Sequence, residues 1–323
     1  MNKVFITGGC GFIGSHLAEL FVSKNFKVTV YDKYNIQNDL NNLTESKYLK
    51  KINIILGDIR DLRHLSNSMK GHDYVIHLAA LIGIPYSYVA PSSYISTNIN
   101  GTFNVLESCL VNKIKKTIVT STSEVYGSGV KFPMTEEHKL NCQSPYSASK
   151  LAADNLAYSY YCSFNLPLNI LRPFNVYGPR QSNRAVIPTI IQQAIFSEKI
   201  KIGNTKSLRD FTYVDDLCLA YFKMLNQNLF NGQIFNTGTG RSYSIEYIIS
   251  CILSILRNNN KKIIFEKKRF RPLKSEVHKL LASTKKIKKL IRWHSKTSLQ
   301  EGLKKTIIWQ KNNQLNEVSK YRI

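Results

Sequence analysis

The sequence has none of the features that mark a membrane, secreted or metal-binding protein. Its 323 residues contain no apolar run approaching the roughly 18–20 residues that span a bilayer. The start, Met1–Lys3, leads into an apolar β run without the h-region of a signal peptide, so we expect no secretory signal. The six cysteines are far apart and form no C-x-x-C pair, which argues against a zinc site and a disulfide framework. These absences predict a cytoplasmic protein with no metal and no membrane partner.

Acidic residues are scarce, with 21 Asp and Glu against 45 Lys and Arg, which gives a formal net charge of +24. Much of the excess gathers in residues 257–323, where Lys and Arg come as short pairs among apolar positions. That pattern is typical of solvated helix faces, and a basic lobe would also attract a doubly charged diphosphate. No zinc-finger, RRM or KH signature accompanies the charge, so we expect no nucleic-acid partner.

The first half of the chain alternates apolar β runs with helical stretches. We expect strands at Lys3–Thr7, Lys27–Tyr31, Ile52–Leu56, Tyr74–His77, Lys116–Ser121 and Leu168–Arg172, and helices near 13–24, 61–69, 92–112 and 145–164. Uninterrupted apolar runs that alternate with helices indicate a parallel sheet buried on both faces. The predicted fold is therefore an α/β, doubly wound Rossmann arrangement, whose ligand lies beyond the carboxyl ends of the strands.

The pattern becomes less regular beyond the sixth expected strand, where prolines punctuate a loop-rich region. A chain of this length divides into two lobes around one cleft. We expect residues 1–172 to form a dinucleotide-binding Rossmann domain. Segments near 211–238 would return to it, with Phe211–Asp216 and Gln233–Asn236 in the main sheet. Residues 173–323 would mainly form a smaller α/β substrate-binding lobe.

A glycine-rich turn follows the first expected strand and opens the first expected helix. Gly8, Gly11 and Gly14 form G-x-x-G-x-x-G, which lets the backbone approach a pyrophosphate on the positive helix N-terminus. Asp32 closes the second strand, where a carboxylate hydrogen-bonds both ribose hydroxyls and repels a 2′-phosphate. NAD is therefore the expected cofactor, although Lys33 weakens the preference over NADP. The predicted cofactor contacts are Gly8, Gly11, Phe12, Ile13, Gly14, Asp32, Lys33, Asp58, Ile59, Leu78, Ala79, Ala80, Thr97, Tyr146 and Lys150.

Tyr146 and Lys150 lie four residues apart, so both project from one face of the helix expected at 145–164. An ordinary tyrosine titrates at about 10 and is a poor base at neutral pH. A nearby ammonium and a positive nicotinamide ring favour the phenolate, so we expect both to lower the pKa of Tyr146. The phenolate would then accept a proton from a sugar hydroxyl while hydride leaves for the cofactor.

The segment Thr122-Ser123-Glu124 follows the fifth expected strand, whose carboxyl end faces the cofactor. Thr122 is placed to hydrogen-bond the reacting hydroxyl. Oxidation at carbon 4 of a hexose makes the hydrogen at carbon 5 acidic, and Glu124 is the carboxylate placed to remove it. The alternative interpretation of Glu124 is a surface glutamate on a strand-to-loop turn.

These motifs together resemble the extended short-chain dehydrogenase/reductase superfamily, in the branch of nucleotide-sugar 4,6-dehydratases. The resemblance runs from the glycine turn to about Trp309. The chain is most similar to the subgroup that makes the 4-keto-6-deoxy form of nucleotide-linked N-acetylglucosamine in bacterial legionaminic acid biosynthesis. The segments that carry this likeness are Ala79–Tyr88, Glu136–His138, Gln143–Lys150 and Arg172–Gln181.

The resemblance implies a three-step reaction with a cofactor that need not dissociate. Tyr146 deprotonates the carbon-4 hydroxyl as hydride passes to NAD. Glu124 then removes the carbon-5 proton as water leaves from carbon 6, and hydride returns to carbon 6. The implied substrate contacts are Ser87, Thr122, Asn175, Arg209 and Arg271. Arginine suits a diphosphate because its planar fork donates two parallel hydrogen bonds.

This chain departs from the glucose-type members at one catalytic position. They carry Asp-Glu where it has Ser123-Glu124, so the carboxylic acid that would protonate the departing hydroxyl is missing. Mannose-type members also have Ser-Glu, which keeps dehydration open with Glu124 or a water as the acid. The helices near 92–112 and 145–164 correspond to the pair that builds a four-helix homodimer interface in relatives, or they pack within the monomer.

Two other interpretations stay open. A nucleotide-sugar 4-epimerase or a UDP-glucuronate decarboxylase would share the fold. An epimerase needs no base at carbon 5. Decarboxylases share the Ser-Glu-Val-Tyr-Gly stretch of residues 123–127, but they usually begin the helix with Tyr-Asp-Glu-Gly-Lys, where this chain has Tyr-Ser-Ala-Ser-Lys from Tyr146 to Lys150. A catalytically silent NAD-sensing or scaffold protein would not need to retain both residues together with Glu124.

Overall fold

The computed structural model describes residues 1–33, 41–227, 231–258 and 260–313. Residues 314–323 of the expected substrate lobe and residues 228–230 of the returning segment lie outside the described residues. In the described part of the chain, no helix is long and apolar enough to cross a membrane.

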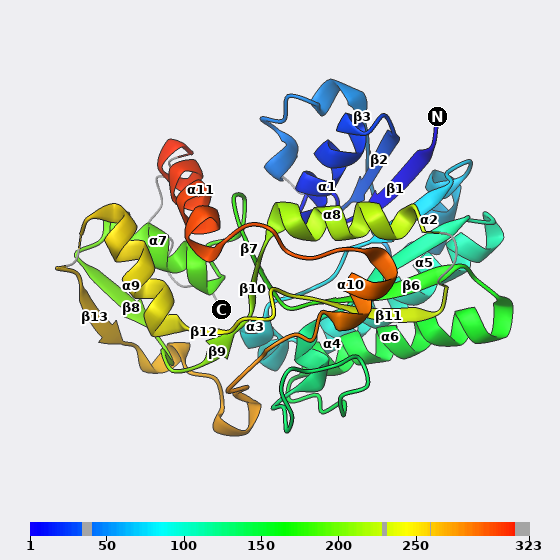
Figure 1. Cartoon of the computed structure of the whole chain (residues 1–323). Coiled ribbons are helices and arrows are strands. Elements are labelled where there is room, and N and C mark those ends of the chain that lie inside the picture. The colour runs from blue at the N-terminus through cyan, green and yellow to red at the C-terminus, as the bar shows by residue number, and fades with distance from the viewer. Residues whose placement is uncertain (34–40, 228–230, 259, 314–323) are drawn as a thin grey trace.

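A seven-stranded parallel sheet forms the centre of the molecule and confirms the doubly wound α/β fold (Figure 1). Its spatial order is β11 (Gln233–Thr237), β6 (Leu168–Pro173), β5 (Lys116–Thr120), β4 (Tyr74–His77), β1 (Lys3–Thr7), β2 (Lys27–Asp32) and β3 (Ile52–Leu56). The order reverses between β1 and β4, so the crevice for a ligand opens beyond the carboxyl ends of these two strands.

Strand β1 shows why the strands read as uninterrupted apolar runs. Val4 and Ile6 point into one hydrophobic cluster, whereas Phe5 points into another on the opposite face of the sheet. All three side chains are fully buried. Burying an aliphatic or aromatic side chain of this size stabilises the fold by roughly 1.5–3 kcal/mol, so both faces of the strand contribute.

Helices cover both faces of the sheet. One face carries α1 (Phe12–Ser23), α8 (Val214–Leu225) and α10 (Lys285–Ile291), and the other carries α2 (Leu62–Met69), α5 (Gly101–Val111) and α6 (Pro145–Phe164). Helix α6 begins with a capping box, in which the hydroxyl of Ser144 accepts from the backbone N–H of Ser147 at 3.1 Å. It ends at Asn165, whose left-handed conformation closes the last turn.

The single helix expected near 92–112 is interrupted. After α3 (Ile84–Val89), the chain forms α4 (Pro91–Tyr94), a π-helical turn η3 (Ile95–Asn100) and then α5. The wider π turn directs Asn98 inward, where its amide accepts from the backbone N–H of Leu81 and donates to the hydroxyl of Ser149 on α6. No periodicity in the sequence signals such a turn, and π turns of this kind often lie at functional sites.

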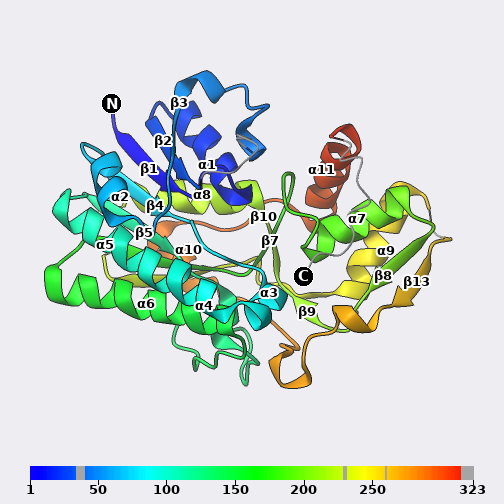
Figure 2. The ribbon, with the colours of Figure 1, turned by 180° about the vertical axis from the view of Figure 1, so that it is seen from behind.

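A second group of elements lies beside the carboxyl ends of the strands (Figures 1 and 2). It contains α7 (Val186–Phe196), β8 (Lys199–Ile202), β9 (Leu208–Arg209), β12 (Tyr243–Ser244), α9 (Ile245–Leu256), β13 (Lys262–Phe265) and α11 (Leu299–Asn312). Short 3-10 turns occur at η1 (Asn41–Leu43), η2 (Leu49–Lys51), η4 (Ser123–Tyr126), η5 (Lys267–Arg269) and η6 (Leu273–Ser275). Parallel pairing of β8 with β13 and antiparallel pairing of β9 with β12 hold this group together.

The returning segments behave differently from one another. Strand β11 joins the main sheet beside β6, as expected for Gln233–Asn236. Phe211–Asp216 does not join it. Instead, β10 (Phe211–Tyr213) pairs in parallel with β7 (Asn175–Tyr177), and α8 begins at Val214. Because β11 already occupies the free edge of β6, no edge of the main sheet remains there for β10.

Helices α5 and α6 pack against each other within the chain. They also leave apolar side chains exposed on their outer faces, among them Phe103 at 42% and Phe164 at 52%. Part of the apolar surface of this helix pair therefore remains exposed after the two helices pack within the monomer.

A buried ion pair joins α6 to the sheet. The carboxylate of Asp154 accepts from Nε of Arg172 at 3.0 Å and from the hydroxyl of Ser121 at 2.7 Å. Nη1 of Arg172 also donates to the hydroxyl of Tyr126 at 3.1 Å, and this hydroxyl donates to Asn236 at 2.8 Å. Both charged side chains are 2% exposed, so neither charge is compensated by solvent.

We expect Asp154→Ala to lower the free energy of unfolding by about 3–5 kcal/mol, because it leaves the charge of Arg172 buried and unpaired. Urea titration followed by circular dichroism measures the loss. Asp215→Ala is the control, because its carboxylate is 59% exposed and pairs only with His16 at 3.3 Å. That change should cost about 1 kcal/mol or less. Equal losses in both variants would contradict this account of the buried pair.

Candidate active site

The glycine turn between β1 and α1 is shaped for close approach. Gly8 has a φ of +71°, and a Cβ there would lie 2.7 Å from the backbone nitrogen of Ala79. A Cβ on Gly14 would overlap the carbonyl oxygen of Gly8 and lie 2.6 Å from the Cα of Gly9. No side chain caps the start of α1 at Gly11, so its N-terminal N–H groups face the cleft and suit an anionic pyrophosphate.

Asp32 ends β2 beside this turn. Its carboxylate accepts from the backbone N–H groups of Cys10 and Lys33, each at 2.7 Å. Burial raises the pKa of Asp32, and these hydrogen bonds oppose the shift. The ammonium of Lys33 points to Asp58 at 3.8 Å, and Arg60 holds the pKa of that carboxyl below its ordinary value. The carboxylate of Asp32 suits the ribose hydroxyls of NAD. The turn at Gly8 and Gly14, which has no room for side chains, suits its pyrophosphate.

All of the expected cofactor contacts line one cleft of about 2620 Å³. This volume exceeds the roughly 300–1,000 Å³ of a pocket for one small ligand, so it has room for a dinucleotide and a nucleotide sugar together. In the described residues, no group of three or more His, Cys, Asp or Glu side chains is arranged to hold a metal ion. The cofactor contacts in the lining are Gly8, Gly11, Phe12, Ile13, Gly14, Asp32, Lys33, Asp58, Ile59, Leu78, Ala79, Ala80, Thr97, Tyr146 and Lys150.

Tyr146 and Lys150 lie on the first two turns of α6 and face the cleft. The ammonium of Lys150 donates to the carbonyl of Thr120 at 2.6 Å, and burial lowers the pKa of Lys150 to about 8. Burial also raises the pKa of Tyr146, although its hydrogen bond with Thr122 opposes this shift. The sequence predicts a lowered pKa for Tyr146. In the protein without a cofactor this pKa is raised instead, because the effect of desolvation is larger than that of the hydrogen bond with Thr122.

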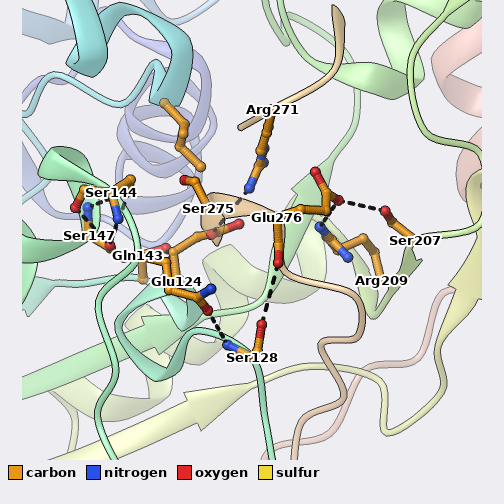
Figure 3. Close-up of polar contacts among 12 residues, drawn as sticks. Glu124, Ser128, Gln143, Ser144, Ser147, Ser207, Arg209, Arg271, Ser275 and Glu276 are labelled. Atoms are coloured by element: carbon orange, nitrogen blue, oxygen red, sulfur yellow. Dashed lines mark hydrogen bonds and ion pairs between the residues drawn. The ribbon is translucent and has the colours of Figure 1, made fainter. Parts of the chain in front are cut away.

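Glu124 lies in the η4 turn directly after β5. The hydroxyl of Thr122 caps this turn by accepting from the backbone N–H of Glu124 at 3.2 Å. The carboxylate of Glu124 is 12% exposed and lies 3.5 Å from Nη1 of Arg271 (Figure 3). It shares the cleft with Tyr146, and Ser123 also contributes to the lining. The structure thus brings a carboxylate and the expected base into one site.

Two arginines from the second group of elements enter the same cleft. Arg209 is 5% exposed and lies 3.7 Å from Glu276, whose carboxylate also accepts from the hydroxyl of Ser207 at 2.7 Å (Figure 3). Burial lowers the pKa of Arg209, and the positive charge of Arg271 adds to that shift. The guanidinium groups of Arg209 and Arg271 lie close to the carboxylates of Glu276 and Glu124. Together the two guanidinium groups form a site suited to a diphosphate.

The two remaining expected substrate contacts differ. Asn175 lines the cleft, and its buried Oδ1 accepts no hydrogen bond from the described residues. Ser87 does not line the cleft. Its side chain is fully buried, and its hydroxyl donates to the carbonyl of Ile84 at 2.7 Å within α3.

Sequence reasoning missed the residues that hold the expected ones in place. Ser207 and Glu276 support Arg209, and the Asp154–Arg172 ion pair lies behind α6. Ser207 stands two positions before Arg209, which is a weak local signal. The other contacts join residues far apart in the chain, and no spacing in the sequence indicates them.

Comparison with known proteins gives the family. A family model described as GDP-mannose 4,6 dehydratase matches residues 5–306. The dTDP-D-glucose 4,6-dehydratase of Dictyostelium discoideum is 34% identical over 97% of this chain and 82% of its own length. The UDP-glucuronate 4-epimerase of Thermodesulfobacterium geofontis is 33% identical, with 97% of each chain covered. The solved dTDP-glucose 4,6-dehydratase of Streptomyces venezuelae, with NAD bound, superposes with a TM-score of 0.88 at 26% identity and covers 96% of this chain and 97% of its own.

The fold and the cleft define an extended short-chain dehydrogenase/reductase with a dinucleotide site and a Tyr-x-x-x-Lys helix. The chain belongs to the GDP-mannose 4,6-dehydratase family, whose relatives here modify nucleotide-linked sugars. Both a dehydratase and an epimerase are similar to it over nearly its whole length, so family membership alone does not choose the reaction.

We expect Gly14→Ala to weaken NAD binding by about tenfold or more, which corresponds to about 1.4 kcal/mol. The added Cβ would push the start of α1 away from Gly8 and open the turn. Titration of NAD against intrinsic tryptophan fluorescence measures the affinity, and circular dichroism checks the fold. An unchanged affinity in a folded variant would show that the cofactor does not rest on this turn.

Proposed function

We propose that the protein is an NAD-dependent nucleotide-sugar 4,6-dehydratase. It converts NDP-N-acetylglucosamine to its 4-keto-6-deoxy derivative for the biosynthesis of a surface-glycan sugar. The observation that carries the proposal is the carboxylate of Glu124, which shares one cleft with Tyr146 and Lys150. The choice of sugar and of legionaminic acid biosynthesis rests on the resemblance of segments such as Gln143–Lys150 and Arg172–Gln181.

Residues 1–172, with the returning segments near 211–238, would form the NAD-binding domain, and residues 173–323 would mainly form the substrate lobe. The glycine turn holds the pyrophosphate, and Asp32 binds the adenosine ribose. When bound, NAD would supply the temporary hydride acceptor and the positive charge of its nicotinamide ring.

Tyr146 removes the proton from the carbon-4 hydroxyl. Burial disfavours its phenolate in the protein alone, so a positive charge beside the ring is needed to lower the pKa of Tyr146 again. Thr122 orients the phenol and the reacting hydroxyl. Lys150 is held by the carbonyl of Thr120 and keeps an ammonium donor beside the cofactor site.

Glu124 removes the carbon-5 proton once carbon 4 is a ketone, because the carbonyl stabilises the resulting carbanion. The protonated Glu124 then returns this proton to the hydroxyl that leaves carbon 6 as water. This double role replaces the carboxylic acid that is missing at Ser123. Arg209, Arg271 and Asn175 hold the substrate, with the two guanidinium groups on the diphosphate.

The exposed apolar faces of α5 and α6 support a homodimer built on this helix pair. None of the six cysteines, all of which lie in the described residues, forms a disulfide bond, which is typical of a protein in a reducing cytoplasm. We propose no nucleic-acid or membrane partner, and we attribute the basic surface to solvated helix faces that also attract an anionic substrate.

A nucleotide-sugar 4-epimerase is the second candidate. The absence of a carboxylic acid at Ser123 favours it, because an epimerase needs only the Tyr146 step and a flip of the keto sugar. Incubation with UDP-, GDP- and dTDP-linked hexoses, followed by mass spectrometry, separates the two activities. A dehydratase product has lost one water, whereas an epimerase product keeps the mass of its substrate.

We expect Glu124→Gln to bind NAD normally but to form the 4-keto-6-deoxy product about 10²–10⁴-fold more slowly, because the amide cannot accept the carbon-5 proton. Product mass and deuterium incorporation at carbon 5 from heavy water are the measurements. Glu137→Gln is the control, since Glu137 is exposed and does not line the cleft. Full dehydration by Glu124→Gln would refute the role of this carboxylate.

We expect Tyr146→Phe to lose even the first oxidation, by about 10²–10⁴-fold, because no other described side chain in the cleft is placed as its base. The phenyl ring keeps the packing against Tyr94, so the fold should remain. Transfer of deuterium from carbon 4 of a labelled substrate to the cofactor, followed in a single turnover, reports this step separately from dehydration. Normal turnover in this variant would show that another base acts.

A further inference from the structure

One segment of the second group of elements is fastened to the first half of the chain. This segment, residues 270–276, is called the strap here. It follows η5 and includes the 3-10 turn η6, and it brings Arg271 and Glu276 into the lining of the cleft. Figure 3 shows Arg271 and Glu276 extending from it towards Glu124 and Arg209. Whatever sets the position of the strap therefore sets the position of Arg271.

Three side chains from the first half of the chain hold the strap through hydrogen bonds, and one of them is Ser128, whose hydroxyl donates to the carbonyl of Glu276 at 3.4 Å. Nε2 of Gln143 donates to the carbonyl of Lys274 at 2.6 Å. The hydroxyls of Tyr88 and Ser275 lie 2.6 Å apart. Neither Gln143 nor Tyr88 lines the cleft, so both act on the outer side of the strap.

Gln143 fastens the strap to the catalytic segments as well. Its Oε1 accepts from the backbone N–H of Ser128 at 2.6 Å (Figure 3). Ser128 follows Gly127, which ends the η4 turn of Glu124 with a φ of +58°. A Cβ on Gly127 would overlap the carbonyl oxygen of Asn141 and lie 2.7 Å from Oε1 of Gln143, so this turn requires glycine.

The position of Gln143 in the sequence adds a third connection. It directly precedes Ser144, the N-cap of α6, which carries Tyr146 on its first turn. One side-chain amide thus connects the turn after Glu124, the start of the catalytic helix and the strap. Both halves of the amide are used, because one accepts from a backbone N–H and the other donates to a carbonyl.

We propose that Gln143 is a positioning residue that, through the strap, directs Arg271 at the diphosphate of the substrate. The inference rests on the proposed function only in taking the ligand to be a nucleoside diphosphate. Without the Gln143 bond, the strap keeps its hydroxyl contacts with Tyr88 and Ser128, and Arg271 keeps its 3.5 Å contact with Glu124. A less ordered Arg271 must then be immobilised when the ligand binds, which lowers affinity.

Gln143→Glu separates the two functions of the amide. The carboxylate still accepts from Ser128, but it cannot donate to Lys274 and repels its carbonyl oxygen. We expect the affinity of the NAD-loaded protein for a nucleoside diphosphate to fall about fivefold, while NAD affinity stays unchanged. Isothermal titration with UDP, GDP and dTDP gives the affinities without requiring turnover.

A double-mutant cycle with Arg271→Gln tests whether Gln143 acts through Arg271. In the Arg271→Gln background, Gln143→Glu should weaken nucleoside diphosphate binding no further. Asn112→Asp is the matched control, because it also replaces an amide that donates to a backbone carbonyl, here that of Ser66 at 3.1 Å outside the cleft. It should leave nucleoside diphosphate affinity unchanged.

The outcomes separate this inference from the proposed function. An unchanged affinity in Gln143→Glu, or an equal loss with and without Arg271, would overturn the positioning role while leaving the dehydratase proposal intact. If the wild-type protein bound none of the three nucleoside diphosphates, the proposed substrate class would fail, and the role of Gln143 would fail with it.

Discussion

The buried ion pair between Asp154 and Arg172 is the contact on which the geometry of the candidate site depends. It joins α6, the helix of the expected base, to β6, and through the hydroxyl of Tyr126 it also reaches the turn that carries Glu124. A buried pair of this kind often stabilises a fold no better than apolar residues of similar volume. Its contribution here is better sought in geometry and charge, because it fixes both catalytic segments to one strand. Asp154 also raises the pKa of the neighbouring lysine of α6 against the effect of burial.

The substrate side of the cleft is organised by paired charges. Arg271 contacts Glu124, and Arg209 lies near Glu276, so each guanidinium group has a carboxylate partner before any ligand is present. If a diphosphate binds as proposed, its two negative charges compete with these carboxylates for the same donors. Drawing Arg271 towards the diphosphate would then weaken its contact with Glu124.

The sequence predicted the parts of this molecule that depend on local patterns. Gly8, Gly14 and Asp32 follow fixed offsets from buried strands, and the structure places them around one cleft. The prediction failed where distant segments decide the outcome. β10 pairs with β7 because β11 occupies the sheet edge, and the helix expected near 92–112 contains a π turn set by contacts of Asn98. The contacts of the strap with Gln143 and Tyr88 join residues more than a hundred positions apart, so no spacing reveals them.

The choice between dehydration and epimerisation depends on Glu124 rather than on the fold. The glycine turn and the Tyr146–Lys150 pair serve any oxidation of a sugar hydroxyl, and relatives with either activity share nearly the whole chain. Epimerisation places no demand on a carboxylate beside the sugar ring. Here the backbone N–H of Glu124 is capped by Thr122, and its carboxylate is largely buried next to an arginine. Keeping a carboxylate in so little solvent costs desolvation energy, and in the proposed dehydration the abstraction of a proton from carbon 5 would give that position a chemical reason.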